Sequence, residues 1–515
     1  MTSHDTPETR RGTQQIGLLL GPILAVAVYA AMPTGAADRH AGLAESGPVV
    51  TAIAVLMAVY WVTEALPIPA TALLPMVLFP LLTGGRISIR AAAAPYAHEL
   101  IFLFMGGFML AMAMQRWGLH RRIALNTVLL MGARPTSIVG GFMAASAFLS
   151  LWVSNTATVV MMYPIAASVV EVVRRQLATE DPRHEALCGS PFPFAVCLLL
   201  GTAYGASIGG VGTLIGTPPN LLLAAYLKEQ FGLEITFVRW MAVGLPFVVV
   251  FLPLTWLLLT RWIYPVRLTA IPGGRQTIRE ELLRQGPMTR GEWIVLVVFV
   301  ATALAWIFRP LIAELELPSG VKPFRGLSDA AIALAASLVL FACPVEPRRG
   351  VFALDWADTR SLPWGVLILF GGGLSLAAGL NDTGVADYIG QGVSSLRDVP
   401  PLVLVAVVTT TIVFLTELTS NTATTATFLP ILGAVAMGLQ LPPPLLVVPA
   451  TIAASCAFMM PVATPPNAII FASGEVTVAQ MCRAGFWLNL VSIGLIVLLV
   501  YALGVRVLLP AGEAL

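Results

Sequence analysis

The stretch SNTATVVMMYPIA at residues 154–166 is nearly repeated as SNTATTATFLPIL at residues 420–432. Each copy lies in a hydrophobic segment, and each has a proline eight residues after its threonine. In hydrocarbon every backbone donor and acceptor needs a partner, so a helix is interrupted only where protein or a water-filled cavity covers the gap. The duplication therefore predicts two interrupted helices with a common purpose.

Composition places these segments in a membrane. Of the 515 residues, 57% are hydrophobic and 11% are charged, whereas soluble domains carry about 25% charged residues. Apolar runs of about 20 residues, long enough to cross a bilayer, recur along almost the whole chain. We therefore expect an all-α polytopic protein whose partner is the lipid bilayer. The net charge of +2 offers no surface for nucleic acid, and we expect no such partner.

The two tripeptides belong to a longer internal repeat. A shift of 266 positions that places Asn155 on Asn421 also places LFMGGFML (103–110) on LFGGGLSL (369–376). Two homologous halves in a polytopic protein are typical of secondary transporters. If each half has an odd number of spans, the second half is inserted upside down, and the sequence predicts two inverted repeats.

A second pair of motifs follows at a different shift. GTPPN (216–220) matches ATPPN (463–467) at 247 positions, and the difference of 19 residues fits a charged insert at 171–193 in the first half. The predicted organisation is a tail and first helix at 1–47, a first repeat at 48–264, a cytoplasmic linker at 265–290 and a second repeat at 291–515.

Four predicted helix breaks lie at the duplicated motifs. Proline has no backbone N–H and cannot continue a preceding helix, and the double glycines permit tight helical hairpins. The predicted breaks are at 154–156, 216–220, 420–422 and 463–467, and the predicted re-entrant hairpins lie near 99–118 and 362–384. A broken helix offers N–H groups to a carboxylate, while its carbonyls and Ser, Thr or Asn oxygens can hold sodium.

Basic side chains are informative both where they occur and where they do not. Arginines collect at residues 10–11 and in the linker, which predicts a cytoplasmic amino terminus and an external carboxyl terminus. Residues 151–170 and 408–435 contain no Arg, Lys or His that could neutralise a substrate anion. Bound sodium is therefore the expected counter-charge and, through its gradient, the expected energy source.

These motifs are similar to those of the divalent anion/sodium symporter family, the INDY-like carriers of dicarboxylates, tricarboxylates or sulfate. The resemblance covers nearly the whole chain and rests on both Ser-Asn-Thr copies, on VGTLIGTPPN and PVATPPNAIIFASG, and on VTEALPIPATALLP at 62–75. It implies a homodimer in a bacterial inner membrane, with about eleven spans, two re-entrant hairpins and an elevator mechanism.

The resemblance also implies residue roles. The substrate carboxylates would contact Asn155, Thr156, Thr217, Ser420, Asn421, Thr422, Thr464 and Pro465. The first sodium would bind to Ser150, Ser154, Asn155 and Gly216, and the second to Thr416, Thr419, Ser420, Asn421 and Ala463. Motifs of equal size in both halves suit a short dianion, so we expect sodium-coupled import of C4-dicarboxylates such as succinate, malate or fumarate.

Several alternatives stay open on the sequence. A sodium-independent dicarboxylate or 2-oxoglutarate exchanger, or a sulfate or citrate carrier, would use the same fold. An intramembrane enzyme would need a base beside Ser154 or Ser420, and a proton antiporter would need an aspartate in the broken segments; both are disfavoured, so we expect a transporter with no catalytic residues. Glu417 could either hydrogen-bond to the scaffold or tune the second cation site.

Overall fold

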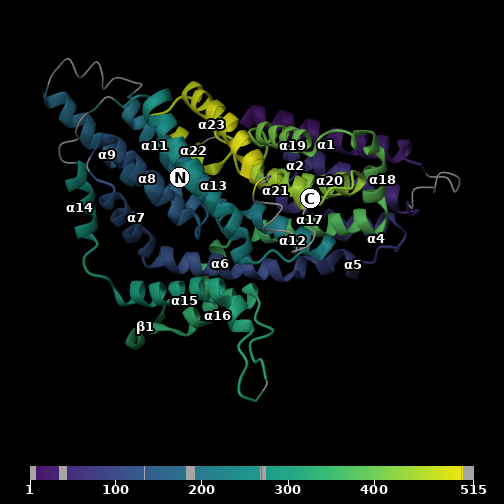
Figure 1. Cartoon of the computed structure of the whole chain (residues 1–515), viewed down its shortest axis with the longest axis horizontal. Helices are drawn as coiled ribbons and strands as arrows, with labels where there is room; N and C mark the ends of the chain where they lie inside the picture. Colours follow the sequence, from purple (N-terminus) through teal and green to yellow (C-terminus); the bar gives the residue numbers. More distant parts are fainter. Residues whose placement is uncertain are drawn as a thin grey trace.

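The computed structural model is built almost entirely of helices (Figure 1), which confirms the all-α prediction. The one sheet in the described part of the chain is a short hairpin of β1 (Pro344–Glu346) and β2 (Val351–Phe352). The structure describes residues 7–33, 43–132, 134–180, 192–266, 268, 274–319, 321–499 and 502.

Eight apolar helical segments in the described residues are long enough to cross a membrane. They are Gln14–Ala31, Ile89–Arg116, Asn155–Arg175, Pro193–Gly210, Phe237–Ile263, Arg290–Ala313, Trp364–Asp382 and Val478–Leu499. Shorter apolar helices lie between them, at Gly47–Thr63, Ile68–Leu82, Pro135–Ser150, Asp329–Ala342, Pro401–Thr416 and Pro444–Ala454. The polytopic architecture is thus confirmed, and the number of about eleven spans stays a prediction.

The helices of the first half follow α1 (Pro7–Ala31). They are α2 (Gly47–Thr63), α3 (Ile68–Thr71), α4 (Leu74–Leu82), α5 (Ile89–Ala93), η2 (Ala94–Ala97), α6 (Glu99–Arg116), α7 (Leu119–Leu130), α8 (Pro135–Ser150), α9 (Asn155–Glu180), α11 (Pro193–Gly210), α12 (Pro218–Phe231), α13 (Phe237–Leu257) and the π-helix η3 (Leu258–Ile263).

The linker contributes α14 (Gly274–Arg284), which packs on α7 and α9. The helices of the second half are α15 (Arg290–Ala313), α16 (Asp329–Ala342), η4 (Pro347–Arg349), η5 (Trp356–Ser361), α17 (Trp364–Asp382), α18 (Val385–Gly392), η6 (Ser394–Leu396), α19 (Pro401–Thr416), α20 (Asn421–Gly438), α21 (Pro444–Ala454), α22 (Pro465–Ala472) and α23 (Val478–Leu499).

The internal repeat is visible in the helix boundaries. Helix α8 spans Pro135–Ser150 and α19 spans Pro401–Thr416, so both ends differ by the same 266 positions. Four-residue connectors, 151–154 and 417–420, lead to α9 and α20, which begin at the two motif asparagines. Because α8 contacts α9 across so short a connector, the two form a helical hairpin (Figure 1) with Ser-Asn-Thr at its tip.

The hairpins expected near 99–118 and 362–384 were wrong in their position. Helices α6 and α17 run without interruption through the double glycines, and the chain turns afterwards at Gly118 and Gly384, both with φ of +72°. The inner glycines serve packing instead: a Cβ on Gly106 would lie 2.7 Å from the Cβ of Ala333 in α16. Glycine within a helix costs only about 1 kcal/mol, so close packing accounts for its use there.

The two halves interlock reciprocally. Helix α9 of the first half packs against α22 of the second, and α20 of the second packs against α12 of the first. In the same way α11 packs against α22, and α21 packs against α12. Such exchanged pairs are the contacts that a two-fold relation between two copies produces.

Some expectations concern residues whose structure is not described. Residues 1–6 and 34–42 of the amino-terminal unit, 181–191 of the charged insert, 267 and 269–273 of the linker, and 503–515 at the carboxyl end lie outside the described residues. Every residue from Phe194 to Gly210 in α11 is described and buried, which places α11 at the core of the first half.

Candidate functional site

The first connector gathers three of the predicted site residues. Helix α8 ends at Ser150, whose Oγ donates a hydrogen bond to Asn155 Oδ1 at 2.5 Å. The Oγ of Ser154 accepts the N–H of Ala157 at 3.3 Å, as a residue preceding a helix commonly does. The break therefore begins just before the expected range 154–156, and it brings Ser150 and Asn155 into direct contact.

The second break of the same half approaches this connector closely. A Cβ on Gly216 would lie 2.8 Å from the carbonyl oxygen of Ser150, and one on Gly210 would lie 2.5 Å from Asn155 Oδ1. Only glycine permits such approach. The structure thus places Gly216, Ser150 and Asn155 together, with carbonyl, hydroxyl and amide oxygens of the kind that bind a hard cation.

The second half repeats the central contact. Thr416 Oγ1 lies 2.8 Å from Asn421 Oδ1 and 2.9 Å from the carbonyl oxygen of Ala454 at the end of α21. Thr416 and Asn421 are the counterparts of Ser150 and Asn155 under the 266 shift. Two of the second set of predicted sodium ligands are therefore in contact.

The other members of that second set lie on the same breaks with different partners. Thr419 Oγ1 is 2.6 Å from Thr424 Oγ1, and Ser420 precedes α20 in an extended conformation without capping it through its side chain. Ala463 donates its N–H to the carbonyl oxygen of Met460 at 3.2 Å.

The Pro-Pro-Asn elements open helices rather than interrupt them. Thr217 precedes α12 and Thr464 precedes α22, with nearly equal backbone angles of φ −143°, ψ 143° and φ −141°, ψ 147°. The breaks themselves are residues 211–217 and 455–464, slightly earlier than expected. Both threonines are buried, whereas Pro465, the first residue of α22, is exposed.

The predicted site residues differ in accessibility. Ser150 and Thr416 are fully buried, at 0% exposed. The predicted substrate contacts Asn155, Thr156, Ser420, Asn421 and Thr422 are half-buried. Inner oxygens are thus enclosed as a dehydrated cation requires, and the helix starts beside them have partial access.

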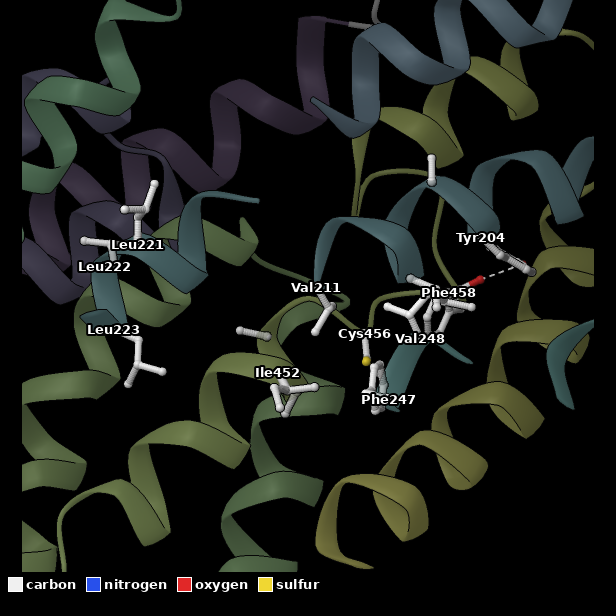
Figure 2. Close-up of a cluster of buried hydrophobic side chains, with 14 of the residues drawn as sticks. Tyr204, Val211, Leu221, Leu222, Leu223, Phe247, Val248, Ile452, Cys456 and Phe458 are labelled. Carbon is white, nitrogen blue, oxygen red and sulfur yellow. Dashed lines mark hydrogen bonds between the residues drawn. The ribbon is translucent and has the colours of Figure 1, made fainter. Parts of the chain in front are cut away.

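A direct bond joins the two halves at their breaks. Tyr204 in α11 donates its hydroxyl hydrogen to the carbonyl oxygen of Phe458, in the break at 455–464, at 2.8 Å. Figure 2 shows this bond among apolar side chains from both halves. They include Val211 of the break at 211–217, and Cys456 beside Phe458. The apolar packing encloses the broken helix ends, so their polar groups are buried in protein.

Glu417 is held by hydrogen bonds to backbone and amide groups. Its two carboxyl oxygens accept N–H groups from residues 458–460 at 2.7–3.0 Å, and Oε1 also accepts Asn489 Nδ2 at 2.8 Å. This geometry assigns Glu417 the scaffold role of the two that the sequence left open. Thr213, Asn220, Asn467 and Asn489 also fasten the breaks, although sequence reasoning gave them no role.

Charge around the breaks is unusual for an anion site. Neither 211–220 nor 455–467 contains Arg, Lys or His, and the described residues hold no cluster of three His, Cys, Asp or Glu side chains suited to a tight metal centre. The polar groups that the breaks present are hydroxyls, amides, carbonyls and helix N-termini. These bind cations weakly and reversibly and can orient an anion.

Comparison with known proteins shows the family of the chain. The family model described as the sodium:sulfate symporter transmembrane region matches residues 15–509. The chain is 42% identical over 492 residues to the sodium-dependent dicarboxylate transporter SdcS of Staphylococcus saprophyticus, covering 95% of this chain and 91% of that protein. The SdcS protein of Staphylococcus aureus strain USA300 gives the same identity and coverage.

A solved structure supports the fold alone. The Alcanivorax borkumensis YdaH transporter is similar with a TM-score of 0.56 and 16% sequence identity, over 96% of this chain and 98% of that one. The apolar helices and the family match show an integral membrane protein from a family of transporters, not of enzymes. The match over nearly the whole length confirms the resemblance to divalent anion/sodium symporters, and the chain belongs to the sodium:sulfate symporter family.

Proposed function

We propose that the protein imports C4-dicarboxylates together with sodium. The observation that carries this proposal is the paired arrangement of Ser150 with Asn155 and of Thr416 with Asn421, one oxygen-rich pair in each half. Each pair offers a place for one sodium ion, and the adjoining helix starts offer N–H groups to a carboxylate. The SdcS relatives, named sodium-dependent dicarboxylate transporters, support this substrate and ion.

The site residues take the roles that the family resemblance implies. Sodium ions bind to Ser150, Ser154, Asn155 and Gly216 in the first half, and to Thr416, Thr419, Ser420, Asn421 and Ala463 in the second. The dianion lies between them against Asn155, Thr156, Thr217, Ser420, Asn421, Thr422, Thr464 and Pro465. Because no basic side chain is present at the breaks, the carboxylates bind well only after sodium has bound, which couples the two.

The membrane topology, the oligomeric state and the transport movement are also proposed. The repeats are inverted about a two-fold axis in the membrane plane, which the reciprocal packing of α9 on α22 and α20 on α12 supports. The protein is a homodimer in a bacterial inner membrane, with its amino terminus in the cytoplasm and its carboxyl terminus outside. Transport proceeds by an elevator movement of the part that carries the breaks.

Uptake by purified protein in liposomes tests the proposal. Labelled succinate should accumulate when sodium is outside and should not accumulate when choline replaces it. A sodium-independent exchanger would ignore that replacement and would require dicarboxylate inside the liposomes. Unlabelled sulfate and citrate should compete poorly; strong competition by either would move the substrate class to that anion.

A further inference from the structure

The third residue of α12, Asn220, bridges the two sides of the break at 211–217. Asn220 is fully buried, at 0% exposed. Its Nδ2 donates to the carbonyl oxygens of Gly210, Val211 and Thr213 at 3.1, 3.3 and 2.7 Å. One amide group at the start of α12 thus holds the carbonyl end of α11 and the connector between them.

The second half contains the same device. Asn467, also at 0% exposed, donates Nδ2 to the carbonyl oxygens of Ala457 and Met460 at 3.2 and 3.1 Å. The shift of 247 positions that aligns the asparagines also aligns Gly210 with Ala457. Phe458, the counterpart of Val211, gives its carbonyl oxygen instead to Tyr204 of the other half (Figure 2).

Helix ends explain why an amide is needed here. The last carbonyls of a helix have no partner within it, and a buried carbonyl without a partner costs about 1–3 kcal/mol. The two prolines before each asparagine supply no N–H. An asparagine side chain has two N–H groups that can satisfy several carbonyls at once, so each asparagine acts as an internal cap across its break.

Each cap is one bond away from a predicted sodium ligand. In the first half Thr213 accepts Asn220 on its carbonyl oxygen and the N–H of Gly216 on its hydroxyl oxygen, at 3.1 Å. In the second half the carbonyl oxygen of Met460 accepts both Asn467 and the N–H of Ala463. Residues 213 and 460 therefore transmit the position of each asparagine to Gly216 and Ala463.

We propose that Asn220 and Asn467 are positioning residues that hold the two breaks in the geometry that binds sodium. This inference rests on the proposed sodium-coupled transport. The asparagines do not contact the ion; they fix the backbone that presents it with oxygens. Within the described residues neither Oδ1 accepts a hydrogen bond, so the fastening is carried by the Nδ2 donors.

Replacing these donors without changing side-chain volume tests the proposal. Asn220→Asp and Asn467→Asp put a carboxyl oxygen where Nδ2 now donates, so this oxygen faces carbonyl oxygens that repel it. Each variant should raise the sodium KM of succinate uptake about tenfold or more. The stabilisation of the purified protein by sodium in a thermal-shift measurement should shrink in parallel, while the dicarboxylate KM at saturating sodium changes less.

Two further variants separate positioning from a loss of folding. Asn220→Ser keeps one donor and should raise the sodium KM about threefold, which keeps the test informative if an Asp variant does not fold. Ser337→Ala is a control away from the breaks, because Ser337 is buried and donates to the carbonyl oxygen of Gly106 at 3.2 Å. It should lower the melting temperature and leave the sodium KM unchanged.

The outcomes are distinguishable. Wild-type sodium KM and wild-type sodium stabilisation in the folded Asn220 and Asn467 variants would overturn the inference and leave sodium-coupled transport standing. Wild-type protein whose uptake and melting temperature ignore sodium would overturn the proposed function itself. A Ser337→Ala variant that raised the sodium KM as much as the Asp variants would show that any packing defect has this effect, and would also overturn the positioning role.

Discussion

The first repeat ties its two breaks together with a hydroxyl group, whereas the second uses a carboxyl group. Thr213 Oγ1 donates to the carbonyl oxygen of Leu151 in the first half. Glu417, the counterpart of Leu151 under the 266 shift, accepts the N–H groups of residues 458–460 and of Asn489 in the second. The helix boundaries are shared, and the chemistry that secures them differs.

A second difference lies one turn further on. In the second half Thr419 and Thr424 pair through their hydroxyl groups at 2.6 Å. In the first half Val153 takes the place of Thr419, and Thr158 Oγ1, buried, has no hydrogen-bond partner among the described residues. Backbone geometry can therefore be copied while the supporting bonds diverge, and we expect Glu417 to hold the breaks of the second half more firmly.

The largest expected effect is common to both halves. Asn155→Ala and Asn421→Ala each remove the amide oxygen that bonds to Ser150 or Thr416 and that we propose to bind both ion and substrate. Succinate uptake into liposomes should fall about 100-fold or more, equivalent to about 2.8 kcal/mol. Size-exclusion chromatography and melting temperature should show intact protein. Wild-type uptake by either variant would remove the twin breaks from the mechanism.

Glu417 should contribute more to the stability of the protein than Thr213 does. In Glu417→Gln one oxygen becomes a donor that faces backbone N–H groups, so about 3 kcal/mol of stability should be lost. Thr213→Val removes one hydroxyl and should cost about 1 kcal/mol. Thermal unfolding in detergent measures both. Equal losses, or a larger loss for Thr213→Val, would contradict the expectation that the breaks of the second half are held more firmly than those of the first.

The turns at Gly118 and Gly384, outside the breaks, should respond alike to alanine substitution. Gly118 and Gly384 have the same φ of +72°, and a Cβ on Gly118 would meet nothing within 4 Å. Alanine at Gly118 therefore adds only the backbone cost of the left-handed region, about 1–2 kcal/mol, and the equal φ predicts the same backbone cost at Gly384. Gly118→Ala and Gly384→Ala should lower the melting temperature equally with sodium KM unchanged. Unequal shifts would show that the repeats differ in their turns as well.

The smallest expected effect converts one half toward the other. Val153→Thr supplies the hydroxyl that the second half has at Thr419, within reach of the unpaired Thr158 Oγ1 if the repeats match there. The new hydrogen bond should stabilise the protein by about 1 kcal/mol. We expect Val153→Thr to raise the melting temperature, and we expect no rise when Thr158→Val is also present. If Val153→Thr destabilises the protein both with Thr158 and with Thr158→Val, the repeats do not match at this position.

Sequence reasoning predicted the parts of the site that depend on local chemistry. The repeat shift paired Ser150 with Thr416, which are the last residues of α8 and α19, and the polar tripeptides predicted breaks where α9 and α20 begin. It misplaced the hairpin turns, because glycine pairs serve close helix packing as well as turns. In α6 and α17 packing decides, with the backbone of Ala72 within 2.3 Å of a Cβ placed on Gly372.

The fastening residues could not be predicted in the same way. Glu417 meets its backbone partners 41–43 positions later in the chain, and Tyr204 meets Phe458 at a separation of 254. Such contacts depend on how the halves pack, which no local pattern specifies. Asn220 and Asn467 lie within recognisable motifs, but their role depends on carbonyls that only the folded break brings together.

Simultaneous measurement of labelled sodium and labelled succinate entering the same liposomes tests the central claim most directly. If each half binds one ion, at least two sodium ions should enter with each succinate, and Asn155→Ala and Asn421→Ala should abolish both fluxes together. Succinate uptake by the wild-type protein without accompanying sodium entry would contradict the account.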